Sequence, residues 1–289
     1  ENEFIALNNA FKKILPNRID ISTIDRPPAH NASGVSSEIL HHLATFIDAA
    51  PVNIASRMPL KSKFDYSKDE LEKLLKLHNR FPKTMLEVGA GAGLLSPHFS
   101  PKSLEFRVTT DICYEMISQA DKKSAGFLAV ADATALPFQG QFDLILMTYD
   151  AVNYLTKPQI QKFFKSVRSL LSPKGVFIFD AATEFNSENY FDDLWDASEI
   201  EGTFIARHSL YDFKRREQKN IFDFFALQKD GSYQRTHEEH TQYIYPLEDL
   251  YRFIKKAGLN VEAVYSEFSF STDLDSASRL QFVVSAEAF

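Results

Sequence analysis

The chain has 289 residues, of which 44% are hydrophobic and 25% are charged, so it can form one large α/β domain with insertions and is too apolar to be disordered. Its net charge of −7 disfavours nucleic acid as a partner, because neutralising phosphates dominates nucleic-acid affinity. The single cysteine, Cys113, excludes a disulfide framework and a thiolate zinc cluster. No apolar run approaches the ~18 residues of a membrane span and the first residues do not form a signal peptide, so we expect a cytoplasmic protein without a membrane partner.

The N-terminal region, residues 1–66, is expected to form an arm and a helical lid. A weak helical pattern is followed by a polar, proline-containing stretch, and a helix is predicted from Ser36 or Ser37 to Pro51. The next helix is predicted to begin at Ser67, because Ser67–Glu70 has the pattern of a capping box.

From Thr84 the sequence alternates between strand and helix patterns. Strands are predicted at five apolar segments: Thr84–Val88, Phe106–Thr110, Phe127–Ala131, Phe142–Thr148 and Gly175–Asp180. Helices are predicted between them, at Leu94–Phe99, Cys113–Ala120 and Gln159–Leu171. This alternation is typical of an α/β, doubly wound, Rossmann-like fold, whose parallel sheet is covered by helices on both faces.

A different pattern follows in residues 183–245. Three long antiparallel strands are predicted there, at Thr203–Phe213, Asn220–Gln228 and Tyr233–Tyr245, with a hairpin turn at Asp230-Gly231. Pro246 opens a helix through Lys256, and the segments Val261–Phe270 and Leu280–Ala286 read as closing strands. The predicted organisation is therefore an N-terminal lid (1–66), a core with a seven-stranded mixed sheet (67–182 and 246–289) and an antiparallel lid insertion (183–245).

The first predicted strand runs into three alternating glycines, Gly89, Gly91 and Gly93. Glycine lets the backbone turn sharply and approach a ligand closely, and a following helix offers free N–H groups. A nucleotide site is therefore expected here. The register is not that of the dinucleotide fingerprint, because Leu94 stands where the third glycine of G-x-G-x-x-G is required.

The segment Glu87–Gly93 resembles motif I of the class I S-adenosylmethionine-dependent methyltransferases. Further segments are similar, in the same order, to the family's second-, third- and fourth-strand motifs and to the loop before its fifth strand: Arg107–Met116, Ala131–Phe138, Gln141–Ile145 and Leu171–Val176. The resemblance covers about residues 67–289. It implies S-adenosyl-L-methionine as the cofactor and methyl transfer as the reaction.

The resemblance also implies which residues meet the cofactor. Asp111 follows Gly93 by close to the ~20 residues expected of the acid that holds the ribose, and a carboxylate can accept both hydrogen bonds of a vicinal diol. Asp132 would meet the adenine amine, or alternatively cap a helix. Glu87 would orient the glycine loop, and Met116 would line the adenine pocket or pack within its helix. The predicted cofactor-binding residues are Glu87, Gly89, Ala90, Gly91, Gly93, Asp111, Ile112, Met116, Asp132, Ala133, Thr148 and Tyr149.

The end of the fourth predicted strand, Thr148–Leu155, should face the reacting methyl, because ligands bind beyond the carboxyl ends of strands in open α/β sheets. It lacks the signature of enzymes that methylate nucleic-acid bases. It is similar to a small-molecule branch of the family, including sugar-amine N-methyltransferases, which carry an Asp-x-x-Asn-Tyr-like stretch here and insert antiparallel strands later. The catalytic candidates are Asp150 and His240 as general bases and Tyr154, which orients the acceptor or packs.

The segment His237–His240 contains two histidines and two acids, yet no metal is expected, because His237 and His240 point to opposite faces of a predicted strand. The function expected is methyl transfer to a nitrogen or oxygen of a small-molecule acceptor. The alternatives are an enzyme acting on a macromolecule (tRNA or protein), a catalytically silent cofactor-binding module, and use of the cofactor for other chemistry. A homodimer is left open.

Overall fold

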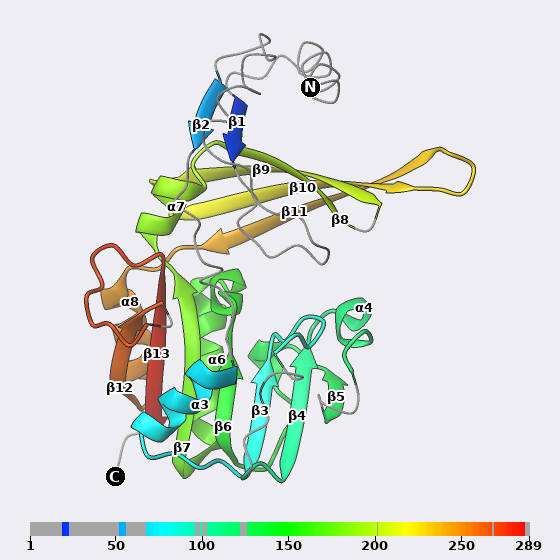
Figure 1. Cartoon of the computed structure of the whole chain (residues 1–289). Helices are drawn as coiled ribbons and strands as arrows, with labels where there is room; N and C mark the ends of the chain where they lie inside the picture. Colours follow the sequence, from blue (N-terminus) through cyan, green and yellow to red (C-terminus); the bar gives the residue numbers. More distant parts are fainter. Residues whose placement is uncertain are drawn as a thin grey trace. The chain divides into compact units, whose positions relative to one another are not determined.

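The computed structural model describes residues 19–22, 52–55, 68–95, 99, 103–121, 126–200, 202–267 and 269–286 (Figure 1). The chain divides into two compact units. The first unit comprises Glu1–Lys63, Phe191–Tyr211 and Lys219–His240, and the second comprises Phe64–Tyr190, Asp212–Gln218 and Thr241–Phe289. The predicted division into lids and core stays a prediction.

Two short strands of the first unit, β1 (Ile19–Ser22) and β2 (Val52–Ala55), pair in parallel. The two N-terminal helices predicted before Pro51, and the predicted cap at Ser67, lie outside the described residues. Among the helices that the structure describes, none is long and apolar enough to cross a membrane.

The second unit is built on a seven-stranded sheet with the order β12-β13-β7-β6-β3-β4-β5. Its strands are β3 (Thr84–Val88), β4 (Phe106–Asp111), β5 (Phe127–Val130), β6 (Phe142–Met147), β7 (Leu171–Ala182), β12 (Leu259–Ser266) and β13 (Arg279–Ala286). The strands from β5 to β7 pair in parallel, whereas β13 lies antiparallel between β7 and β12. The predicted doubly wound, mixed seven-stranded sheet is confirmed.

Helices cover both faces of this sheet. Alternate residues of each strand point to opposite faces, so one strand contributes to the core on either side. On β7, Phe177 and Phe179 pack into one core with the buried phenylalanines of α6 (Lys157–Leu170) and with α8 (Leu247–Lys256). The intervening residues Val176 and Ile178 pack into a second core with α3 (Lys68–Leu77). Phenylalanine rings interlock through the first core, where those of Phe179 and Phe282 stack at 4.6 Å.

Two helices differ in extent from the sequence prediction. Thr156 and Gln159 form a capping box, and Pro158 stands in the first turn of α6, so this helix begins at Lys157, before the predicted start. The helix predicted at Cys113–Ala120 is reduced to a single turn, α4 (Tyr114–Ile117).

The second sheet has four strands in the order β11-β10-β9-β8. They are β8 (Leu194–Ile200), β9 (Thr203–Asp212), β10 (Glu217–Leu227) and β11 (Tyr233–Tyr243). The antiparallel insertion predicted from the sequence is confirmed, and its β10–β11 turn places Gly231 at φ +83°. The strand β8 and the helix α7 (Glu184–Tyr190) are elements that the sequence pattern did not predict.

Candidate active site

The strand order of the seven-stranded sheet reverses between β3 and β6. From β3 the chain continues through β4 to β5 on one side, and it then returns to β6 on the other. In open α/β sheets, ligands bind beyond the carboxyl ends of the strands at such a point. The segments that follow β3, β4, β5 and β6 therefore form the candidate active site.

The glycine loop after β3 has three positions where a side chain would strain the backbone, and at two of them a Cβ would also be crowded. Gly89, Gly91 and Gly93 have φ values of +70°, +57° and +70°, which side-chain-bearing residues rarely adopt. A Cβ on Gly89 would lie 3.1 Å from the Cβ of Ala151, and one on Gly93 would lie 2.7 Å from the Cβ of Ala120. The loop is thus packed between the segment after β6 and the segment after α4.

Asp111 ends β4 and organises this loop. Its Oδ2 accepts a hydrogen bond from the Gly91 amide at 2.7 Å, and its Oδ1 accepts one from the Cys113 amide at 2.8 Å. A carboxylate has about four acceptor positions, so each oxygen retains one for a further donor. The arrangement lets Asp111 hold the loop and still accept from a vicinal diol.

Asp132 follows β5 and caps the 3-10 turn η1 (Ala133–Ala135), its Oδ1 accepting from the Thr134 amide at 2.7 Å. The capping alternative considered from the sequence is therefore present in the structure. It does not exclude the adenine contact, because the residue is exposed and a carboxylate with one engaged oxygen has further acceptor positions.

Large apolar side chains are exposed around the same strand ends. Ile112 is 67% exposed and Met116 is 43% exposed, and Tyr149 after β6 is 36% exposed. The Met116 Cε lies 3.4 Å from where a Cβ on Gly91 would be, so this side chain reaches over the glycine loop. Exposed apolar side chains grouped at a strand-end site suit the faces of a heteroaromatic ring.

Three predicted cofactor residues are less accessible. Glu87 is buried beside Arg107, whose pKa is lowered by burial and raised to a smaller extent by the charge of Glu87. This placement agrees with a supporting role for Glu87 beneath the loop. Thr148 is also buried, and Ala133 packs against the phenylalanine-rich core, so side-chain contact with a ligand is disfavoured for both.

The backbone after β6 turns sharply. Tyr149 and Asp150 have φ values of +60° and +52°. Their amides both donate to the buried carboxylate of Asp180, at 2.9 and 2.5 Å, and this shared acceptor holds the turn in place. The 3-10 turn η2 (Ala151–Tyr154) follows directly.

The Asp150 side chain is held on both oxygens. Arg279 donates to Oδ1 at 3.0 Å, and Gln242 donates to Oδ2 at 2.9 Å. Burial raises the pKa of Asp150, the charge of Arg279 opposes this rise, and the charge of Asp180 adds to it. The side chain nevertheless keeps 22% of its surface exposed, so a small molecule can reach it.

The other two catalytic candidates fall in different places. Tyr154 lies near Asp150, and desolvation of its hydroxyl, together with the charge of Asp150, raises the pKa of Tyr154 to about 12. His240 belongs to the first unit, where its ring packs against Phe222 and its Nε2 lies 3.0 Å from Glu238. The structure thus places Tyr154 close to Asp150, and the role of His240 stays a prediction.

The His237–His240 segment has the geometry expected of a strand. His237 contacts Asp223 and His240 contacts Phe222, and these two neighbours on β10 point to opposite faces of the sheet. The side-chain hydrogen bond from His237 to Asp223 raises the pKa of His237. Within the described parts of the chain, no group of three potential metal ligands is found.

Sequence reasoning missed four residues of the site. Asp180, Gln242 and Arg279 surround Asp150, as described above. The fourth, Asn153, is fully buried and fastens η2 by accepting from the Ala182 amide and donating to the Tyr243 carbonyl, both at 2.9 Å. Two signals were available: Asn153 is the asparagine of the Asp-x-x-Asn-Tyr-like stretch, and Asp180 lies near the carboxyl end of a central apolar strand, as Asp111 does.

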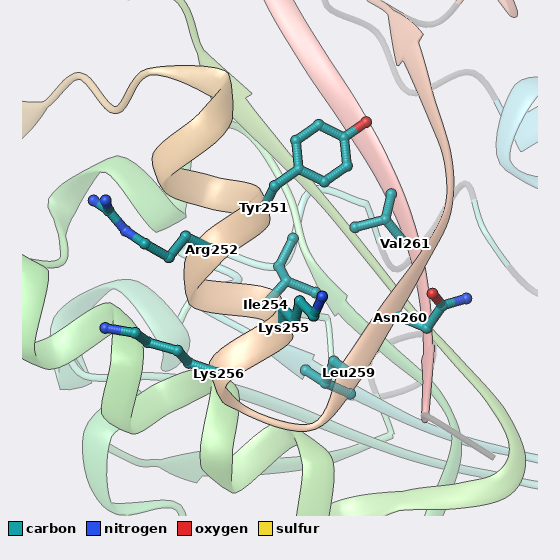
Figure 2. A pocket seen from close by; sticks show the side chains of 8 residues that line it. All are labelled: Tyr251, Arg252, Ile254, Lys255, Lys256, Leu259, Asn260 and Val261. Atoms are coloured by element: carbon teal, nitrogen blue, oxygen red, sulfur yellow. The ribbon is translucent and has the colours of Figure 1, made fainter.

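A separate hollow of about 740 Å³ lies between α8 and β12 (Figure 2). Tyr251 from the helix and Val261 from the strand lie on either side of it, and three basic residues line its helical side: Arg252, Lys255 and Lys256. None of the predicted site residues lines this hollow, so it is distinct from the strand-end site.

Residues 85–175 match a family model described as a methyltransferase domain. This range contains the glycine loop, Asp111, Asp132 and Asp150. The chain carries a class I methyltransferase domain. S-adenosylmethionine is the cofactor of this family.

Two curated proteins are similar to this methyltransferase. YqeM of Bacillus subtilis (strain 168) is 28% identical over 205 residues, covering 68% of this chain and 82% of that protein. Its name describes it as a methyltransferase and mentions no acceptor. The human mitochondrial arginine-hydroxylase NDUFAF5 is 25% identical over 133 residues, covering 44% of this chain and 37% of that protein.

Two solved structures share the fold of this methyltransferase. An S-adenosylmethionine-dependent methyltransferase from Clostridium acetobutylicum ATCC 824 has a TM-score of 0.66 at 24% identity, covering 78% of this chain and 92% of that chain. The sugar N-methyltransferase KedS8 from Streptoalloteichus sp. ATCC 53650 has a TM-score of 0.61 at 14% identity, covering 91% of this chain and 97% of that chain. At these identities the likeness establishes the fold.

Proposed function

We propose that this methyltransferase transfers the methyl group of S-adenosylmethionine to a nitrogen or oxygen of a small-molecule acceptor. The observation that carries the proposal is Asp150, an accessible carboxylate held on both oxygens next to the glycine loop. Ala151, the next residue, packs against Gly89, which fixes the distance between the loop and the carboxylate. The likeness to a sugar N-methyltransferase over 91% of the chain supports a small acceptor.

The residues around the glycine loop fit the cofactor. Asp111 retains acceptor positions for the ribose hydroxyls, and Asp132 retains them for the adenine amine. Ile112 and Met116 offer exposed apolar surface for the adenine ring. The bound cofactor supplies an electrophilic methyl group on a cationic sulfonium.

The chain's own contribution to the reaction is to position the acceptor and to take a proton. The acceptor nitrogen or oxygen bonds to the methyl carbon as the carbon–sulfur bond breaks, and its proton leaves to a base. In its ionised form Asp150 can accept that proton. Tyr154, with a pKa of about 12, is a neutral phenol at physiological pH and can hydrogen-bond the acceptor without taking part in proton removal.

The test is a panel of amino sugars, small amines and hydroxylated compounds, incubated with the protein and S-adenosylmethionine and analysed by mass spectrometry. We expect at least one compound to gain a methyl group, with S-adenosylhomocysteine formed in equal amount. Saturable cofactor binding without turnover on any acceptor would instead favour a silent binding module.

A second candidate function is modification of a macromolecule, and the match to an arginine hydroxylase over 44% of the chain favours it. Proteins and tRNA treated with the enzyme and the cofactor would distinguish the two. The mass of the product identifies the chemistry, because a methyl group and an oxygen atom add different masses. The cytoplasmic location and the homodimer left open above stay predictions.

A further inference from the structure

Asp150 is held by two residues that come from distant parts of the chain, one on each carboxylate oxygen. We infer that Arg279 and Gln242 are positioning residues, which aim the Asp150 carboxylate at the acceptor and favour its ionised form. This inference rests on the proposed function, because it assigns both residues a role in the same reaction. Neither residue needs to touch the substrate or the cofactor.

Arg279 connects the side chain of Asp150 to the carboxylate that holds its backbone. Its Nη2 donates to Asp150 Oδ1 at 3.0 Å, and its Nη1 lies 3.4 Å from Asp180 Oδ1. Arg279 side-chain exposure is only 10%, so the guanidinium works in a largely desolvated setting. A lysine would carry the same charge, but its single ammonium lacks the planar fork that meets two carboxylates at once.

The backbone that Asp180 holds is itself unusual. Tyr149 and Asp150 are consecutive non-glycine residues in the left-handed region, which persists only where the surrounding structure determines it. Both of their amides donate to Asp180. The Asp180–Arg279 pair therefore sets both the course of the chain at Asp150 and the direction of its side chain.

Gln242 is the last member of a buried chain of side-chain hydrogen bonds. The Ser187 hydroxyl donates to Gln218 Oε1 at 2.8 Å, and Gln218 Nε2 donates to Gln242 Oε1 at 3.2 Å. Gln242 Nε2 then donates to Asp150 Oδ2 at 2.9 Å. Every donor points toward Asp150, so successive dipoles reinforce one another and stabilise the carboxylate charge.

Two charged side chains act on Asp150 in opposite directions. Among the described residues, the charge of Arg279 favours the ionised form of Asp150 and the charge of Asp180 opposes it, while the charge of Asp150 acts in turn on Tyr154 of η2. Arg279 and Gln242 occupy two of the carboxylate's about four acceptor positions. The two left over belong to the accessible part of the side chain, which is where an acceptor N–H or O–H would be met.

The test compares Arg279→Lys and Gln242→Met with Arg252→Lys, a matched control on α8 whose side chain pairs with Asp249. Each is made alone, and the first two are also combined with Asp150→Asn. We expect each positioning variant to lower kcat by about 10- to 100-fold, as a small misplacement of a reacting group does, while the Kd for S-adenosylhomocysteine stays within about twofold. Each double variant should then be no slower than Asp150→Asn alone, because the lost contact acts through Asp150.

A second measurement needs no turnover. The Asp150 carboxyl carbon, assigned by its absence in Asp150→Asn, is titrated by NMR in the wild-type protein and in Gln242→Met. The pKa of Asp150 should rise in Gln242→Met, because this variant removes a hydrogen bond to the charged form. If no acceptor is ever methylated, this titration still decides whether Gln242 stabilises the carboxylate, so failure of the proposed function is recognised separately.

The inference is overturned if the losses in kcat are additive with that of Asp150→Asn, if Arg279→Lys behaves like Arg252→Lys, or if the Asp150 titration is the same with and without Gln242. Should Arg279→Lys fail to fold, the Gln242→Met cycle and its titration decide the question alone.

Discussion

Replacing Gly93 by alanine tests the packing of the glycine loop directly. The position has φ +70°, and the new Cβ would lie 2.7 Å from the Cβ of Ala120, where carbon atoms normally approach to ~3.5–4.0 Å. The left-handed backbone costs about 1–2 kcal/mol for an alanine. The overlap of ~1 Å adds the cost of an overpacked contact, about 1–3 kcal/mol. We therefore expect the free energy of unfolding to fall by about 2–5 kcal/mol.

Two glycines of the same unit separate these contributions. Gly91→Ala shares the positive φ, of +57°, but its Cβ would meet only the flexible end of Met116 at 3.4 Å, so it should lose the backbone contribution alone. Gly140→Ala has neither penalty, since no atom of the described residues would lie within 4 Å of its Cβ, and should be neutral or slightly stabilising. In the double variant Gly93→Ala/Ala120→Gly, the overlap is removed and the packing loss should be recovered.

The stabilities of these variants are compared by urea unfolding without cofactor, monitored by circular dichroism. If the m-value is the same in all variants, the differences between their unfolding midpoints report differences in stability. A Gly93→Ala variant as stable as Gly91→Ala would refute the reasoning, because Ala120 would then yield without cost and the loop would not be packed against the segment after α4.

Further predictions concern the site. Asp111→Ala removes charge-assisted hydrogen bonds worth roughly 1.5–3 kcal/mol each, so cofactor affinity measured by calorimetry should fall more than tenfold; an unchanged Kd would exclude the ribose role. Asp150→Asn should lower kcat and leave the cofactor Kd nearly unchanged, whereas equal losses in both would argue against catalysis. Because burial raises the pKa of Asp150, kcat should decline as the pH falls through a value above the usual aspartate range, and Asp150→Asn should lose this acidic limb. His240→Gln should reduce kcat less than Asp150→Asn does, since the His240 ring is already engaged by Glu238 and Phe222, and a larger loss would favour His240 as the base.

The sequence predicted the second unit well, because its strands carry simple local signals. The strands β3 and β6 are short, mostly apolar runs, β4 is rich in β-branched residues, and the glycines after β3 and the acid that ends β4 mark ligand-facing strand ends. The strand β8 was missed because its segment, Leu194–Ile200, mixes acidic and small residues and has no clear apolar alternation. Such a strand depends on pairing with β9, which is a tertiary effect.

The surroundings of Asp150 could not be predicted, because they join residues far apart in the chain. Gln242 follows Asp150 by 92 residues and Arg279 follows it by 129. Arg279 precedes the predicted closing strand, Leu280–Ala286, and Gln242 is one polar position among many in the predicted strand Tyr233–Tyr245. Only the antiparallel placement of β13 beside β7 brings Arg279 to Asp180 and so to Asp150.

Isothermal titration calorimetry with S-adenosylhomocysteine tests the central claim most directly, namely that the ends of β3, β4 and β5 form a cofactor site. Wild-type protein should bind one equivalent, Asp111→Ala should bind markedly more weakly, and Arg252→Lys in the separate hollow should bind as the wild type does. Folded wild-type protein that takes up no S-adenosylhomocysteine, or an Asp111→Ala variant that binds it as tightly as the wild type, would contradict the account.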